Sequence, residues 1–144
     1  MPNILAYGMI LLWPFIAILF YKKFDTVTAT FWTIVGGYML LPAKTVFDFP
    51  MVPPIGKDEM SAIAALIGCV VIKNKKIAFL GANNLQKTLI GLLLFIPLIN
   101  VFFNSEPMFN GKIWVQGLTL YDAIGQVVLQ YLQLLPFVIA ISIV

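Results

Sequence analysis

The chain has 144 residues, of which 61% are hydrophobic and only 10% are charged, and its net charge is +3. A soluble domain of this length exposes too much surface to carry so few polar side chains, so this composition is typical of a polytopic membrane protein. Every basic residue is a lysine, and the lysines are few and scattered, which indicates membrane topology and not a nucleic-acid surface. The single cysteine, Cys69, lies in an apolar run and is predicted to be a packing residue.

Two apolar runs in the first third of the chain are long enough to cross a bilayer. Residues 4–21 carry no charge and meet the requirement of about 20 apolar residues for a spanning helix. The run lacks the features of a cleaved signal peptide, so it is predicted to be a retained span. Residues 27–43 form the second predicted span, and Gly36 and Gly37 within it would let another helix come close.

A proline-rich connector, FDFPMVPPIGKDE, follows at residues 47–59. Proline fixes one backbone angle and restricts the residue before it, so we expect an extended, non-helical segment. Asp48 is the one acid in its apolar part. Two interpretations stay open: a structural hairpin between helices, with Asp48 at the water interface, or an external surface where a ligand head group binds.

The third predicted span, 58–72, is short. It crosses the bilayer only if Lys57 and Lys73 snorkel at its ends or the bilayer thins locally, and a re-entrant half-span is the alternative. Asp58 suits the start of this helix, where a carboxylate meets the positive end of the helix dipole. Residues 77–82 are apolar but too short to cross, so they are expected at the interface or as an extension of the next helix.

Two further spans are predicted at 85–103 and 123–144, separated by a polar loop. The fold class is therefore all-α: a single transmembrane helical domain, 1–144, with about five spans. Six lysines fall in the first and third connectors and three in the second and fourth. The positive-inside rule then places the N-terminus outside and the C-terminus inside, with the FDFPMVPPIGKDE connector external.

A polar stripe runs along the last predicted span. It contains four residues with spacings of four, four and three, which share one helical face: Asp122, Gln126, Gln130 and Gln133. Such side chains are costly in hydrocarbon unless they are paired, so the stripe predicts either interhelical hydrogen bonds or a polar wall along a path for a lipid-linked substrate. The earlier spans offer few polar partners, and the last span has no basic flank. These observations predict that the domain is incomplete at its C-terminal end.

Several segments, taken in order, resemble bacterial O-antigen polymerase and ligase-like proteins. The matching segments are LP at 41–42, FDFPMVPPIGKD at 47–58, AALIGC at 64–69, GLTLYDA at 117–123 and LLPF at 134–137. The resemblance implies a multi-pass protein of the bacterial inner membrane in lipopolysaccharide or exopolysaccharide synthesis. It implies a glycosyltransferase-type reaction that polymerises or transfers glycans carried on undecaprenyl pyrophosphate, on the outer side of the membrane.

The resemblance also limits what is expected of this chain. The functional arginines and histidine of the family lie largely on later external loops, and this chain has neither residue type. We therefore carry over no catalytic residue and expect the chain to be inactive alone, completed by further helices of a longer protein. No metal or cofactor is predicted, and the expected partners are the lipid-linked glycan and the bilayer. The external, substrate-facing candidates are Asp48, Lys57, Asp58, Tyr121 and Asp122.

Two other functions stay open from the residues. The chain is alternatively a complete membrane scaffold or accessory subunit without catalysis, which docks a partner on its glutamine stripe. The last alternative is a channel- or transporter-like oligomer in which the same stripe lines a pore.

Overall fold

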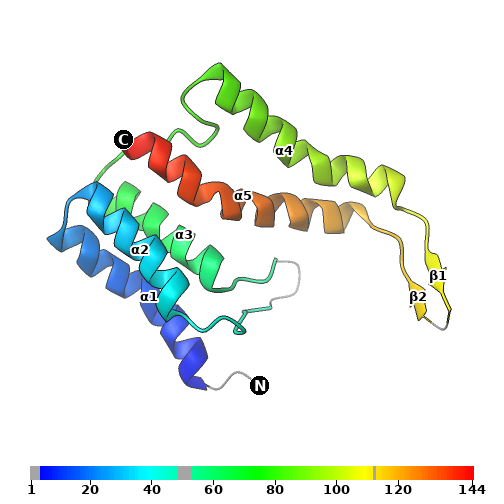
Figure 1. Cartoon of the computed structure of the whole chain (residues 1–144), viewed down its shortest axis with the longest axis horizontal. Coiled ribbons are helices and arrows are strands. Elements are labelled where there is room, and N and C mark those ends of the chain that lie inside the picture. The colour runs from blue at the N-terminus through cyan, green and yellow to red at the C-terminus, as the bar shows by residue number, and fades with distance from the viewer. Residues whose placement is uncertain (1–3, 49–52, 112) are drawn as a thin grey trace.

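The computed structural model describes residues 4–48, 53–111 and 113–144 (Figure 1). The described residues form five α-helices, one π-helical segment and a two-stranded antiparallel hairpin. In chain order these are α1 (Ile4–Lys23), α2 (Thr26–Leu40), α3 (Lys57–Ile67), η1 (Gly68–Ile72), α4 (Asn84–Phe103), β1 (Met108–Asn110), β2 (Ile113–Val115) and α5 (Leu120–Ile143). The predicted helical class is confirmed, but a hairpin occupies part of the segment predicted as a polar loop.

Three helices, α1, α4 and α5, are long and apolar enough to cross a membrane. The other two are shorter, with 15 residues in α2 and 11 in α3. The predicted second span extends too far, because α2 ends at Leu40 and Leu41 is already extended, with ψ of 146°. Pro42 follows directly, and a residue before proline is disfavoured in the helical region. The count of five spans and the orientation stay predictions.

Helices α1, α2 and α3 form a compact group, and α4 and α5 extend beyond it as an arm (Figure 1). Helices α1, α2 and α3 pack on one another, and α5 packs on α3 and α4. Helix α4 contacts mainly α5. The described parts of the connectors 41–56 and 104–119 lie toward one end of the helices, with 104–119 farther out, and the connectors 24–25 and 73–83 lie toward the opposite end (Figure 1).

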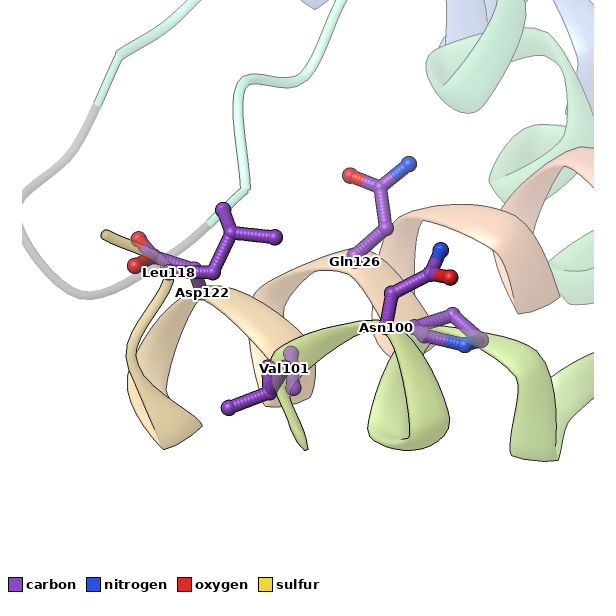
Figure 2. A pocket seen from close by; sticks show the side chains of 7 residues that line it. Asn100, Val101, Leu118, Asp122 and Gln126 are labelled. Carbon is purple, nitrogen blue, oxygen red and sulfur yellow. The ribbon is translucent and has the colours of Figure 1, made fainter. Parts of the chain in front are cut away.

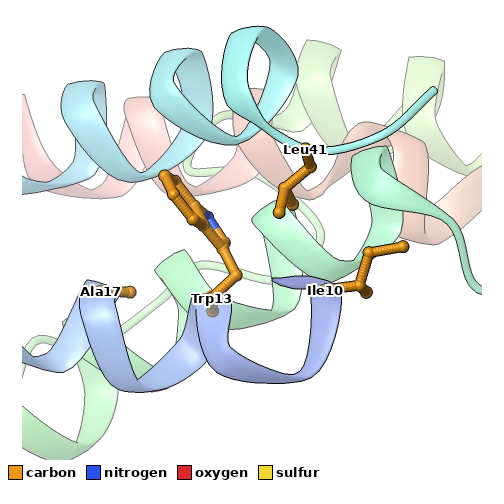
Figure 3. Packing of buried hydrophobic residues seen from close by; sticks show 5 residues of the cluster. Ile10, Trp13, Ala17 and Leu41 are labelled. Atoms are coloured by element: carbon orange, nitrogen blue, oxygen red, sulfur yellow. The ribbon is translucent and has the colours of Figure 1, made fainter. Parts of the chain in front are cut away.

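Small residues let α1, α2 and α3 approach closely. A Cβ atom on Gly37 would collide with the Ser61 hydroxyl of α3, so this crossing requires glycine. Trp13 rises from α1 toward α2, and its ring lies 3.2 Å from where a Cβ on Gly36 would stand (Figure 3). Its indole nitrogen donates to the Thr33 carbonyl at 3.1 Å. One buried tryptophan therefore both fills and hydrogen-bonds the α1–α2 interface.

A second buried cluster joins α1 and α2 to η1. The Tyr21 hydroxyl lies 2.7 Å from the Thr30 hydroxyl and 3.4 Å from the Cys69 sulfur, and all three side chains are buried. The Tyr21 ring lies against Gly68, where a Cβ atom would overlap the ring. The prediction that Cys69 packs inside the protein is confirmed.

The segment 77–83 between η1 and α4 is not helical, so residues 77–82 do not extend the next helix. Side chains satisfy its backbone: Ala78 N donates to the Ser142 hydroxyl at 3.0 Å, and the Tyr131 hydroxyl donates to the Phe79 carbonyl at 2.9 Å. A left-handed glycine, Gly81 with φ of +91°, turns the chain. Irregular backbone at a membrane protein's apolar surface needs such partners, and α5 supplies two of them.

Candidate functional site

A pocket of about 270 Å³ opens between the C-terminal half of α4 and the start of α5. Seven residues line it: Pro97, Asn100, Val101, Leu118, Asp122, Ala123 and Gln126. Figure 2 shows Asn100 of α4 and Gln126 of α5 pointing to the same side of the two helices. The pocket thus has an apolar floor and two neutral amides on its wall.

The start of α5 is fixed by a reciprocal cap. The Asp122 carboxylate accepts from the Thr119 backbone amide at 2.8 Å and from the Thr119 hydroxyl at 2.7 Å. The Asp122 amide donates back to the Thr119 hydroxyl at 3.3 Å. This arrangement satisfies two of the free amides at a helix start. Asp122 therefore has a structural role at the pocket edge, in addition to presenting a carboxylate there.

Two backbone segments cross closely beside the pocket. The Leu118 amide donates to the Asn104 carbonyl at 2.8 Å, and a Cβ atom on Gly117 would overlap the Ser105 carbonyl. The base of the β-hairpin is therefore closed, and glycine is required at 117. A second, wider pocket of about 450 Å³ adjoins here and is lined by Gln116, Gly117, Leu118, Thr119 and Asp122. Leu118 and Asp122 line both pockets, so the two pockets are neighbours, and we call them together the hollow.

The chemistry of this hollow is neutral to weakly acidic. Amides such as Asn100 and Gln126 both donate and accept hydrogen bonds, and Asp122 adds accepting oxygens. Hydroxyl groups match this set, because each is also both a donor and an acceptor. A diphosphate does not match it, since Asp122 would repel it and, among the described residues, no cation lines either pocket.

The predicted polar stripe is retained, because all four of its residues lie in the continuous helix α5. Only Asp122 and Gln126 reach the pocket. The Gln130 carbonyl oxygen is buried, and no described group donates to it. Gln133 is exposed and lies outside both pockets. The stripe therefore consists of a pocket wall, a buried amide and an exposed amide.

The remaining predicted site residues lie outside the pocket. Asp48 is exposed, next to the Phe47–Ile55 bridge that closes the proline-rich connector. The Lys57 ammonium donates to the Tyr38 carbonyl at 3.0 Å, at the end of α2. One buried oxygen of Asp58 has no donor among the described residues. All three belong to the 41–56 connector or the start of α3, toward the same end of the helices as the pocket (Figure 1).

Tyr121, the last predicted candidate, is 52% exposed on the first turn of α5. Five of the seven lining residues were not predicted as site residues: Pro97, Asn100, Val101, Leu118 and Ala123. Pro97 and Asn100 lie three residues apart and therefore share one face of α4. This spacing places the Asn100 amide on the same face as the proline. In the described part of the chain, no group of three metal-ligating side chains comes together.

No protein-family model, curated protein or solved structure matches this chain. The resemblance to O-antigen polymerase and ligase-like proteins therefore stays a prediction from the sequence. Three of the described helices are long and apolar enough to cross a membrane, which supports the membrane class predicted from the composition.

Proposed function

We propose that this chain is the membrane part of a protein that polymerises or transfers glycans carried on undecaprenyl pyrophosphate at the outer face of a bacterial inner membrane. One observation carries the proposal. The described parts of the two connectors that hold the main resembling segments, 41–56 and 104–119, lie toward the same end of the helices (Figure 1). The hollow between α4 and α5 opens beside one of them.

The pocket chemistry supports placing the glycan, and not the diphosphate, in this hollow. Sugar hydroxyls fit the amides of Asn100 and Gln126 and the carboxylate of Asp122. Exposed apolar side chains on α4 flank the same region, including Phe95 and Phe102 at 55% and 81% exposure, and suit a lipid chain. Diphosphate binding and catalysis are assigned to groups outside this chain, because arginine forks or a metal grip such an anion best.

The direct test is a binding measurement on the purified chain in nanodiscs. An undecaprenyl-pyrophosphate-linked oligosaccharide is added, and bound ligand is counted by native mass spectrometry. The double variant Asn100→Leu with Gln126→Leu removes both amides while keeping similar volumes. We expect affinity to fall about tenfold or more, because each lost hydrogen bond is worth roughly 1 kcal/mol.

Gln133→Leu is the matched control, because it removes an exposed amide of the same helix outside both pockets. It should leave binding unchanged. A double variant that binds as well as the parent chain, or a parent chain that binds the lipid carrier equally well without its sugars, would overturn the assignment of the glycan to this hollow.

A further inference from the structure

The molecule is strongly asymmetric in charge along its long helices. We call the end that holds the connectors 24–25 and 73–83 the lysine end (Figure 1). It holds one acid, Asp25, and six lysines: Lys22, Lys23, Lys73, Lys75, Lys76 and Lys87. The described residues at the opposite end include two lysines and five acids: Lys44, Lys57, Asp48, Asp58, Glu59, Glu106 and Asp122. Among the described residues, the two ends therefore carry opposite net charge.

The lysine end presents its charges to the outside. Five of its six lysines are exposed, and the sixth, Lys73, is half-buried. The carboxylate of the single acid, Asp25, accepts a hydrogen bond from the Thr28 amide at 3.0 Å and caps α2. The Lys73 ammonium donates to the Phe24 carbonyl at 2.8 Å, which ties the two connectors together. This contact joins the segments that hold Lys22, Lys23, Lys73, Lys75 and Lys76, and we call these five lysines the platform; Lys87 lies on the first turn of α4.

Apolar side chains lie near the platform in the sequence. Phe79 and Leu80 follow the Lys73–Lys76 cluster and are 49% and 54% exposed. Hydrogen bonds hold the backbone of this segment against α5. The Ala78 amide donates to the Ser142 hydroxyl, and the Tyr131 hydroxyl donates to the Phe79 carbonyl. Exposed aromatic and aliphatic groups beside lysines are the combination that binds a membrane interface.

We propose that the lysine end binds the headgroup phosphates of anionic phospholipids in the leaflet that it faces. Lysine stems lie along the apolar surface while their ammonium groups reach the phosphate level. Each lysine near an anionic lipid surface contributes favourably, and the contributions of a cluster accumulate. This site is at the opposite end from the proposed glycan hollow, so it is independent of the proposed function.

The test uses the purified full chain in detergent micelles, with phosphatidylglycerol or phosphatidylcholine added and bound lipids counted by native mass spectrometry. We expect the parent chain to prefer phosphatidylglycerol, and the preference to weaken as ionic strength rises. The variant Lys75→Gln with Lys76→Gln should lower affinity for phosphatidylglycerol about fivefold for each lysine removed. Both side chains are exposed, so folding should be unaffected.

Two controls separate charge from other effects. Lys75→Arg with Lys76→Arg retains the charge and should retain the preference. Lys44→Gln removes an exposed lysine at the opposite end and should change nothing. Equal binding of both lipids by the parent chain, or an equal loss in Lys44→Gln, would overturn the proposal. Displacement of the lipid by inorganic phosphate at matched concentration would also overturn it, because the site would then recognise free phosphate.

Discussion

The group of α1, α2 and α3 and the α4–α5 arm are built on different principles. Helix α3 buries five of its 11 residues, whereas α4 buries two of its 20. The residues at the α2–α3 contact are small, so the backbones approach closely, while α4 carries mostly large apolar side chains that point outward. Inside a bilayer such outward groups cost nothing, because lipid tails are equally apolar. Close packing therefore stabilises the three-helix group, and the arm keeps room for a pocket.

The largest expected effect lies within the three-helix group, between one tryptophan that is packed and one that faces outward. Trp13 is 3% exposed between α1 and α2, whereas Trp32 of α2 is 49% exposed. We expect Trp13→Ala to lower the free energy of unfolding by roughly 3–5 kcal/mol, because it leaves a cavity and frees the Thr33 carbonyl. Trp32→Ala should cost clearly less. Unfolding in mixed micelles with increasing denaturing detergent measures both variants. Equal decreases in the free energy of unfolding would show that burial does not distinguish the two tryptophans.

The next test makes the same glycine-to-alanine substitution beside the three-helix group and in the arm. A Cβ atom on Gly68 would overlap the Tyr21 ring, while one on Gly91 of α4 meets nothing within 4 Å. We expect Gly68→Ala to destabilise the protein by about 1–3 kcal/mol through overpacking. Gly91→Ala should stabilise it by up to about 1 kcal/mol, because alanine is the better helix former. The same unfolding assay applies, and two changes of equal sign would contradict the comparison.

The smallest effect is a dependence of stability on pH within the three-helix group. The Thr28 backbone amide donates to the Asp25 carboxylate, which holds the pKa of that carboxyl below its ordinary value of 3.8. Since the folded state binds the proton less tightly than the unfolded state, the stabilisation is complete above the ordinary pKa and disappears as pH falls through the folded pKa. Asp25→Asn should flatten stability measured across this range. A variant with the same acid profile as the parent would exclude Asp25 as its source.

Much of the helical layout was predictable, because long apolar runs have few alternatives in a membrane. The predicted spans 4–21, 85–103 and 123–144 agree with α1, α4 and α5 to within three residues. The end of α2 was predictable from Pro42 but was placed too late. The hairpin also had a local signal, since Asn110–Gly111 lies between apolar residues and Gly111 has φ of +63°.

Features that depend on distant contacts were not predictable from local pattern. The Tyr21 ring packs against Gly68 at the start of η1, and the two residues are 47 positions apart, so no local spacing reveals this contact. The pocket likewise depends on how α4 lies against α5. The stripe predicted Asp122 and Gln126 because helical periodicity fixes a face, but periodicity does not say which part of that face another helix covers. Gln133 is exposed for that reason.

The π-helical turn η1 rotates the residues that follow it about the axis of the helix. Its bond from the Lys73 amide to the Gly68 carbonyl spans five residues where an α-helix spans four. One extra residue rotates everything after it by about 100° relative to a continued α-helix. Upstream, α3 keeps its small residues against α1 and α2, and downstream Lys73 still reaches the Phe24 carbonyl. Deleting one residue within 68–72 would restore the α-helical phase and turn Lys73 away, uncoupling the packed core from the lysine end.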